Sequence, residues 1–169
     1  PLQWYQENDI KLTLSTNVEA IDTANKTLKL SNGESRSYDK LILATGAECN
    51  IPPIKGADCS NVFSIRKLSD ANEIRKRIDN ISDIAVIGGG VLGLEAAWEL
   101  SRAGKNVTIL EVSDGLMKNQ LDDRASQLLK ENAEKSGLKV LTDVKIDQIT
   151  EAGIDLADGT KVAGQLVII

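Results

Sequence analysis

The sequence predicts an α/β fold in which helices pack against a parallel sheet, with a three-stranded β-meander beside it. Two apolar runs, Ile84–Ile87 and Val107–Glu111, flank a glycine-rich turn and a helical pattern, which gives the order strand, helix, strand. A third apolar run at Leu138–Leu141 continues this alternation. Leu28–Gly33 and Ile154–Gly159 are similar to each other, and each precedes another apolar run, which indicates a repeated meander.

The composition narrows the possible functions. The chain has 169 residues, enough for one or two small domains with their own core. A net charge of −5 and an aromatic content of 3% disfavour a nucleic-acid or anionic-membrane partner. Because the chain has no histidine, Ser–His–Asp triads and the usual zinc sites are excluded, and we predict no metal site.

Two further features indicate a cytoplasmic protein. Cys49 and Cys59 are neither a C-x-x-C pair nor a metal pattern, so they are interpreted as reduced thiols. The most apolar stretch, Ile84–Leu100, is short for a membrane span and contains four glycines and two glutamates. We therefore predict no transmembrane helix.

The first third of the chain is expected to be β-structure. Ile10–Leu14 and Val18–Ile21 alternate between apolar and polar residues, which predicts strands. Thr27–Leu30 leads to a turn in which Asn32-Gly33 supplies the residues of positive φ. The apolar run Lys40–Ala44 predicts a buried strand that ends at Ala-Thr-Gly.

Residues 47–61 are interpreted as a linker, since Pro52-Pro53 prevents a helix there. A helix is predicted to begin near Ser69 or Asp70, and the basic run Arg66–Arg77 is interpreted as its solvated face. Two further helices are predicted at Leu94–Ala103 and Asp122–Ser136.

The repeat also bears on the extent of the chain. Its copies lie 126 residues apart at the turn and 125 apart at the following strand. Strand–helix–strand elements precede the second copy, whereas the chain begins too late to show them before the first. We therefore expect both ends to be truncated, so that the chain is part of a larger protein.

The strongest functional motif satisfies G-x-G-x-x-G, directly after an apolar strand and before a helix. Gly88 permits the tight turn, Gly90 lets a pyrophosphate approach the backbone, and Gly93 lets helix and strand pack closely. The helix N-terminus offers free N–H groups to the phosphates. The competing interpretation is a plain packing turn. The candidate dinucleotide-binding residues are Gly88, Gly89, Gly90, Val91, Leu92 and Gly93.

Glu111 ends the second strand 23 residues after Gly88, where a carboxylate accepts hydrogen bonds from the adenosine ribose. This charge repels a 2′-phosphate, and Val112 and Ser113 offer no cation, so we predict NADH rather than NADPH. A solvated strand-end glutamate is the alternative. Glu95 lies in the first turn of the helix, where by itself it complements the helix dipole.

These features together resemble flavoproteins of the pyridine nucleotide-disulphide oxidoreductase fold, a Rossmann-like FAD/NAD(P)-binding architecture. The four segments that carry this resemblance are Tyr38–Ala47, Ile51–Gly56, Ala85–Ala97 and Ala157–Ile169. A fifth segment, Gly115–Asp122, resembles more narrowly the FAD-NAD modules of rubredoxin reductase-like proteins and nitrite reductase large subunits.

The resemblance implies two domains. Residues 1–60 would be part of an FAD-binding domain plus linker, in which Ala44, Thr45 and Gly46 contact FAD. Residues 61–169 would be the NADH-binding domain, and Glu95 would lie near nicotinamide and flavin as a catalytic residue. FAD would be held mainly by segments outside this chain. No C-x4-C redox disulphide is present, so disulphide reduction is not assigned.

The predicted function is therefore that of the NADH-binding portion of an FAD-dependent oxidoreductase. Hydride would pass from NADH to flavin, and electrons would continue to an acceptor such as rubredoxin or nitrite reductase centres. The alternative is a non-catalytic NAD(H)-binding sensor or scaffold module. A methyltransferase-like domain is disfavoured, because it does not account for Pro52-Pro53 or the repeated meander.

Overall fold

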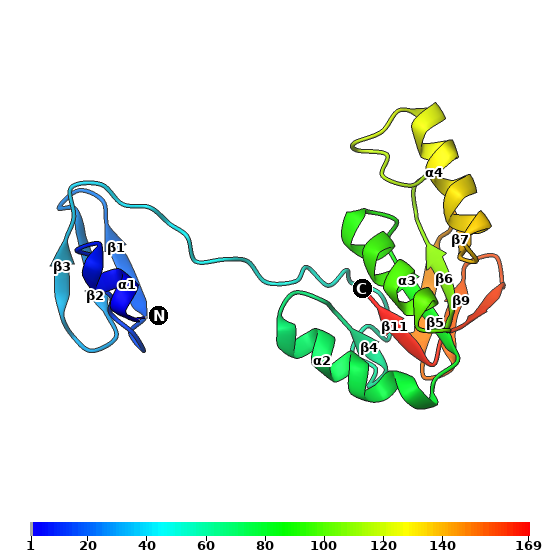
Figure 1. The fold of residues 1–169 in the computed structure, drawn as a ribbon, viewed down its shortest axis with the longest axis horizontal. Helices are drawn as coiled ribbons and strands as arrows, with labels where there is room; N and C mark the ends of the chain where they lie inside the picture. The colour runs from blue at the N-terminus through cyan, green and yellow to red at the C-terminus, as the bar shows by residue number, and fades with distance from the viewer. Residues whose placement is uncertain (1) are drawn as a thin grey trace. The chain divides into compact units, whose positions relative to one another are not determined.

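The computed structural model describes residues 2–169, which form two compact units (Figure 1). The first unit ends at Gly46 and the second runs from Ala47 to Ile169. Each unit is described by itself. Within residues 2–169, every helix is too short or too polar to cross a membrane.

The first unit is built on a three-stranded antiparallel meander, β1-β2-β3. The predicted strands at Val18–Ile21 and Thr27–Leu30 are confirmed. The sequence reasoning missed the short helix at the start, in which Gln3 Nε2 donates to Glu7 Oε1 at 2.7 Å. The elements are α1 (Leu2–Glu7), β1 (Val18–Asp22), β2 (Thr27–Leu30) and β3 (Ser35–Ser37).

Two strands predicted in this unit are wrong. Ile10–Leu14 is irregular, and Lys40–Ala44 is not a strand either. Ile42 is 88% exposed and Leu43 is 68% exposed, so the run is not buried. An apolar run becomes a buried strand only where neighbouring strands satisfy its backbone groups, and β1-β2-β3 does not include this segment.

The second unit contains a five-stranded parallel sheet of order β4-β11-β5-β6-β7 and a second meander of order β10-β9-β8. This arrangement confirms the predicted fold class. The sheet strands are β4 (Val62–Phe63), β5 (Asp83–Ile87), β6 (Asn106–Leu110), β7 (Lys139–Leu141) and β11 (Leu166–Ile168). The other elements are α2 (Leu68–Arg77), η1 (Ile78–Asn80), α3 (Val91–Arg102), α4 (Asp123–Lys135), β8 (Ile146–Thr150), β9 (Gly153–Leu156) and β10 (Lys161–Ala163).

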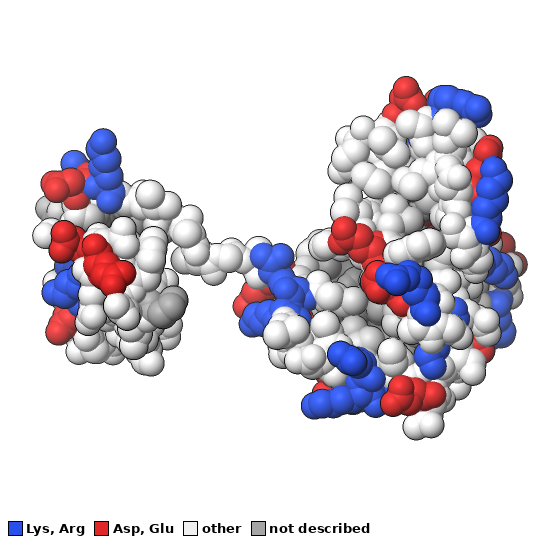
Figure 2. Space-filling view, in the orientation of Figure 1, with Lys and Arg blue, Asp and Glu red and all other residues white. Residues whose placement is uncertain are grey.

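The basic run around α2 is largely a solvated helix face, as predicted. Lys76 and Arg77 are exposed and form ion pairs with Glu73 at 3.7 and 3.2 Å. On the face of the protein shown in Figure 2, acidic and basic side chains are interspersed. Surface pairs of this kind contribute little to stability. Arg66 differs from the rest of the run, because it precedes α2 and lines a cavity.

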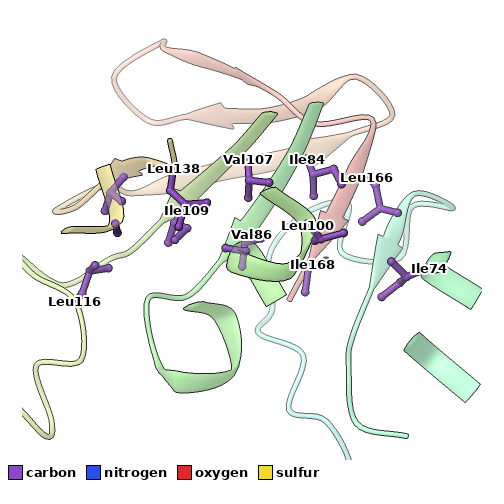
Figure 3. Close-up of a cluster of buried hydrophobic side chains, with 13 residues drawn as sticks. Ile74, Ile84, Val86, Leu100, Val107, Ile109, Leu116, Leu138, Leu166 and Ile168 are labelled. Atoms are coloured by element: carbon purple, nitrogen blue, oxygen red, sulfur yellow. The ribbon is translucent and has the colours of Figure 1, made fainter. Parts of the chain in front are cut away.

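The core of the second unit lies on both faces of the parallel sheet, because successive residues of a strand point to opposite sides. In β5, Ile84 and Val86 belong to one apolar cluster, with residues of α3. Ala85 belongs to a second cluster, with residues of the meander. Figure 3 shows the first cluster, where side chains of β5, β6 and β11 meet. Burial on both faces explains the nearly continuous apolar runs in the sequence.

The two meanders share one backbone pattern, which confirms the repeat for the meander, whereas the strand predicted to follow each copy forms only after the second, as β11. Gly33 and Gly159 have φ of +84° and +87°. Each donates its N–H to the carbonyl three residues earlier, at 2.9 and 3.0 Å. The side chains of Asn32 and Asp158 accept the N–H two residues later, at 3.1 and 2.8 Å. The predicted turn is corrected in one respect, since Asn32 has no positive φ and contributes its side-chain oxygen instead.

Candidate nucleotide-binding site

The glycine-rich turn connects β5 to α3 at the carboxyl edge of the parallel sheet. Gly88 has φ of +108°, which favours glycine, and its N–H donates to Leu110 O of the neighbouring strand at 2.8 Å. The helix begins at Val91, three residues earlier than the sequence predicted, with Gly90 as its N-cap. Val91, Leu92 and Gly93 therefore form the first helical turn.

The amino end of α3 has backbone N–H groups without a helical hydrogen-bond partner. Leu94 N donates to Gly90 O at 3.0 Å, so the amides before Leu94 lie ahead of this first helical hydrogen bond. No side chain caps the helix. Free N–H groups and the positive end of the helix dipole are the features that bind phosphate.

Two glycines of the motif, Gly93 and Gly90, differ in the space around them. A methyl group at Gly93 would collide with the carbonyl oxygen of Gly88, so the fold itself requires a glycine there. Gly90 has an ordinary φ of −82°, and a Cβ built on it would meet no protein atom within 4 Å. Nothing in residues 2–169 requires a glycine at this position. The bare backbone leaves room for a ligand beside the amides of α3.

Glu111 lies directly after β6 and is half-buried. Its Oε2 accepts the N–H of Gly89 at 2.6 Å, and its Oε1 accepts the N–H of Ser113 at 2.7 Å. A carboxylate offers about four acceptor positions, so it retains capacity for ribose hydroxyls. Strand β6 therefore places the predicted acid, Glu111, in hydrogen-bond contact with the glycine-rich turn.

Two cavities meet at this turn, and Ile87 and Gly88 line both of them. One has a volume of about 540 Å³ and includes the first turn of α3 together with Arg66 and Gln120. The other has a volume of about 390 Å³ and places Glu111 among mainly apolar residues. Each volume is typical of a small-molecule site. The apolar residues of the smaller cavity are Pro52, Ile54, Ile87, Leu110, Val112, Val144 and Ile146.

The structure does not assign a role to the other predicted site residues. Glu95 lies on α3, is exposed and lines neither of the two cavities. Ala44, Thr45 and Gly46 belong to the first unit and are exposed, and no strand ends there. Their roles stay predictions.

The sequence reasoning missed several residues at the cavities. Arg66 belongs to the run that is predicted to be a solvated face, yet its Nε donates to Ala47 O at 2.7 Å. Lys145 brings a positive charge to the cavity that holds Glu111. Gln120 belongs to the segment Gly115–Asp122, which was noticed only for its resemblance. No periodicity or spacing marks such residues, because loops bring them to the site.

A family model described as pyridine nucleotide-disulphide oxidoreductase matches residues 3–169. The chain belongs to this family. The NAD(P)H nitrite reductase of Bacillus subtilis is 37% identical over 98% of the chain and 21% of that protein. The rubredoxin-NAD(+) reductase of Pseudomonas putida is 30% identical over 100% of the chain and 45% of that protein.

Solved structures agree with this family membership. A ferredoxin reductase from Rhodopseudomonas palustris superposes with a TM-score of 0.90, at 26% identity, over 99% of the chain and 43% of that structure. The chain thus spans less than half the length of each of these three relatives. The resemblance inferred from the sequence is confirmed, including the similarity to nitrite and rubredoxin reductases.

Proposed function

We propose that this chain is the NADH-binding portion of an FAD-dependent oxidoreductase. Residues 61–169 are assigned to the NADH-binding domain, and residues 1–60 to part of an FAD-binding domain plus linker. In the whole protein, a hydride passes from NADH to flavin, and electrons continue to an acceptor such as rubredoxin or nitrite reductase centres. The names of the related reductases support this assignment.

The observation that carries the proposal is the open backbone at Gly90. An ordinary φ and empty surroundings mean that the protein does not itself require a glycine there. A diphosphate against the amides of Val91 and Leu92 does require it, because a side chain would occupy its place. The residues at the turn therefore fit a dinucleotide.

The two cavities support a direction for the dinucleotide. We assign the adenosine half to the cavity that contains Glu111, where Leu110 and Val144 give it apolar walls. The nicotinamide half is then assigned to the larger cavity, beside Val91 and Leu92. Glu111 holds the adenosine ribose through its remaining acceptor positions.

When bound, NADH supplies the hydride, and the protein's task is to hold and orient it. The amides of α3 neutralise the diphosphate charge, and Glu111 fixes one ribose. We assign Glu95 a place near the nicotinamide and flavin, and Ala44, Thr45 and Gly46 a place against FAD. These assignments rest on the family resemblance.

Calorimetric titration of the purified chain with NADH, and separately with NADPH, tests the proposed function. We expect binding with a preference for NADH, and no measurable binding by the Gly90→Val variant. Heat release by neither nucleotide, with the chain folded by circular dichroism, would contradict the proposed site.

A further inference from the structure

The backbone of Gly89 forms two hydrogen bonds with other segments and packs closely against Leu116. Glu111 Oε2 accepts the N–H of Gly89 at 2.6 Å. The N–H of Met117 donates to Gly89 O at 3.1 Å. A methyl group on Gly89 would collide with Leu116, which is fully buried. The middle residue of the glycine turn is therefore fixed before any nucleotide arrives.

The loop that holds Gly89 is itself anchored to α4. Leu116 O accepts a hydrogen bond from the buried hydroxyl of Ser126 at 2.7 Å. Lys118 contacts Asp114 at 3.2 Å and Asp123 at 2.5 Å, and these hydrogen bonds raise the pKa of Lys118. Met117 has φ of +51°, a left-handed backbone conformation that is strained for a residue other than glycine. The structure thus accepts local strain in the loop that contacts the turn.

Glu111 is anchored in the same manner. Its backbone N–H donates to Leu141 O at 2.8 Å, which keeps the residue in line with the sheet. Its second carboxylate oxygen accepts the N–H of Ser113 at 2.7 Å. Two amide protons converge on one carboxylate, and hydrogen bonds to an ionised acceptor are stronger than neutral ones.

We propose that Glu111 is a positioning residue that holds the phosphate-binding turn in its binding conformation in the absence of nucleotide. This inference rests on the proposed dinucleotide site and adds to the ribose contact assigned there. One carboxylate serves both roles, since two amide hydrogen bonds leave acceptor positions free. Glu111 then lowers the ordering cost of binding for any ligand that uses the turn, with or without an adenosine ribose.

Amide hydrogen exchange on the nucleotide-free 169-residue chain, followed by two-dimensional NMR, tests the inference. Glu111→Ala removes both acceptors, so exchange at Gly89 and Ser113 should accelerate at least tenfold. Glu111→Gln keeps a single carbonyl oxygen, so one of the two amides should stay protected. Glu99→Gln, an exposed glutamate on α3 paired with Arg102, is the control of equal charge change and should leave both amides unchanged.

A second measurement separates positioning from ribose contact. Reduced nicotinamide mononucleotide carries one phosphate and lacks the adenosine ribose. Positioning predicts that Glu111→Ala weakens this ligand at least threefold in an NMR titration, whereas a ribose contact alone predicts no change.

The outcomes are distinct. Exchange within twofold of wild type at Gly89 in Glu111→Ala would overturn the inference even if NADH binding is lost. Accelerated exchange together with a wild-type chain that binds no NADH would support the positioning role and reject the proposed function. If Glu111→Ala does not fold, the half-protected pattern of Glu111→Gln decides the matter.

Discussion

The carbonyl oxygen of Gly88 occupies the space that a side chain of Gly93 would need, so the backbone that follows strand β5 packs directly against helix α3. Three residues away, a Cβ on Gly90 would have no atom of the described part of the chain within 4 Å. Packing requires the glycine at position 93, whereas we propose that a bound ligand requires the glycine at position 90.

This difference makes a paired prediction. Gly90→Val should fold with its midpoint of thermal unfolding within a few degrees of wild type, while its NADH affinity falls at least a hundredfold. Gly93→Ala should instead lower that midpoint strongly, because its methyl group collides with backbone. Circular dichroism melts and NADH calorimetry check both variants. Wild-type NADH affinity in Gly90→Val would refute the phosphate site.

Glu111→Ala should change which nucleotide is preferred. The loss of turn positioning weakens NADH and NADPH alike, but only NADH also loses its ribose acceptor. For NADPH, part of this loss of affinity is offset, because the repulsion between the Glu111 carboxylate and the 2′-phosphate disappears while Lys145 still lines the same cavity. We expect NADH affinity to fall about tenfold to a hundredfold, at ~1.4 kcal/mol per decade, and NADPH affinity to fall less. Parallel calorimetric titrations measure the ratio, and an equal fall would exclude the ribose contact.

Gly56, the glycine of the predicted linker, should not tolerate a side chain. It has φ of +82°, and a methyl group there would collide with the backbone oxygen of Ile149 in β8. Gly56→Ala should therefore cost about 3 kcal/mol in the free energy of unfolding. Gly104→Ala is the matched control, with φ of +79° and open surroundings, and should cost about 1 kcal/mol. Urea denaturation compares the two, and equal costs would argue against tight packing of the linker on β8.

The start of α2 should show a dependence on pH. Asp70 Oδ2 accepts the N–H groups of Lys67 and Arg66 at 2.8 and 3.0 Å, and these hydrogen bonds lower the pKa of Asp70. A lowered folded-state pKa contributes stability that is present above the unfolded pKa and is lost as pH falls below about 4.

Asp70→Asn removes this titration, so wild type should melt at a higher temperature than the variant at pH 7. The two melting temperatures should approach each other as the pH falls below about 4 and Asp70 becomes protonated. Asp147→Asn, at an exposed position in β8, is the control. A gap between wild type and Asp70→Asn that does not change with pH would contradict this origin.

The sequence was sufficient where the signal is local. A few neighbouring residues are enough to identify the G-x-G-x-x-G turn and the acid after β6. The same holds for each strand and helix in the alternation from β5 to β7. The repeat was also visible, because Gly33 and Gly159 need the same left-handed backbone. Local reading failed for Lys40–Ala44, which has the composition of a buried strand but is not one. The similar run at β11 is a strand because β4 and β5 flank it.

What the sequence alone determined is therefore the fold class, the repeat and the residues of the glycine turn, since these depend on periodicity and on backbone conformations that only certain residues adopt. Only the tertiary structure showed that Glu111 and Met117 form hydrogen bonds with the backbone of Gly89, and that Leu116 packs against it. It also showed that Lys145 lines the same cavity as Glu111. These contacts join segments through loops. No spacing in the chain encodes them, because side-chain contacts between distant segments are set by packing.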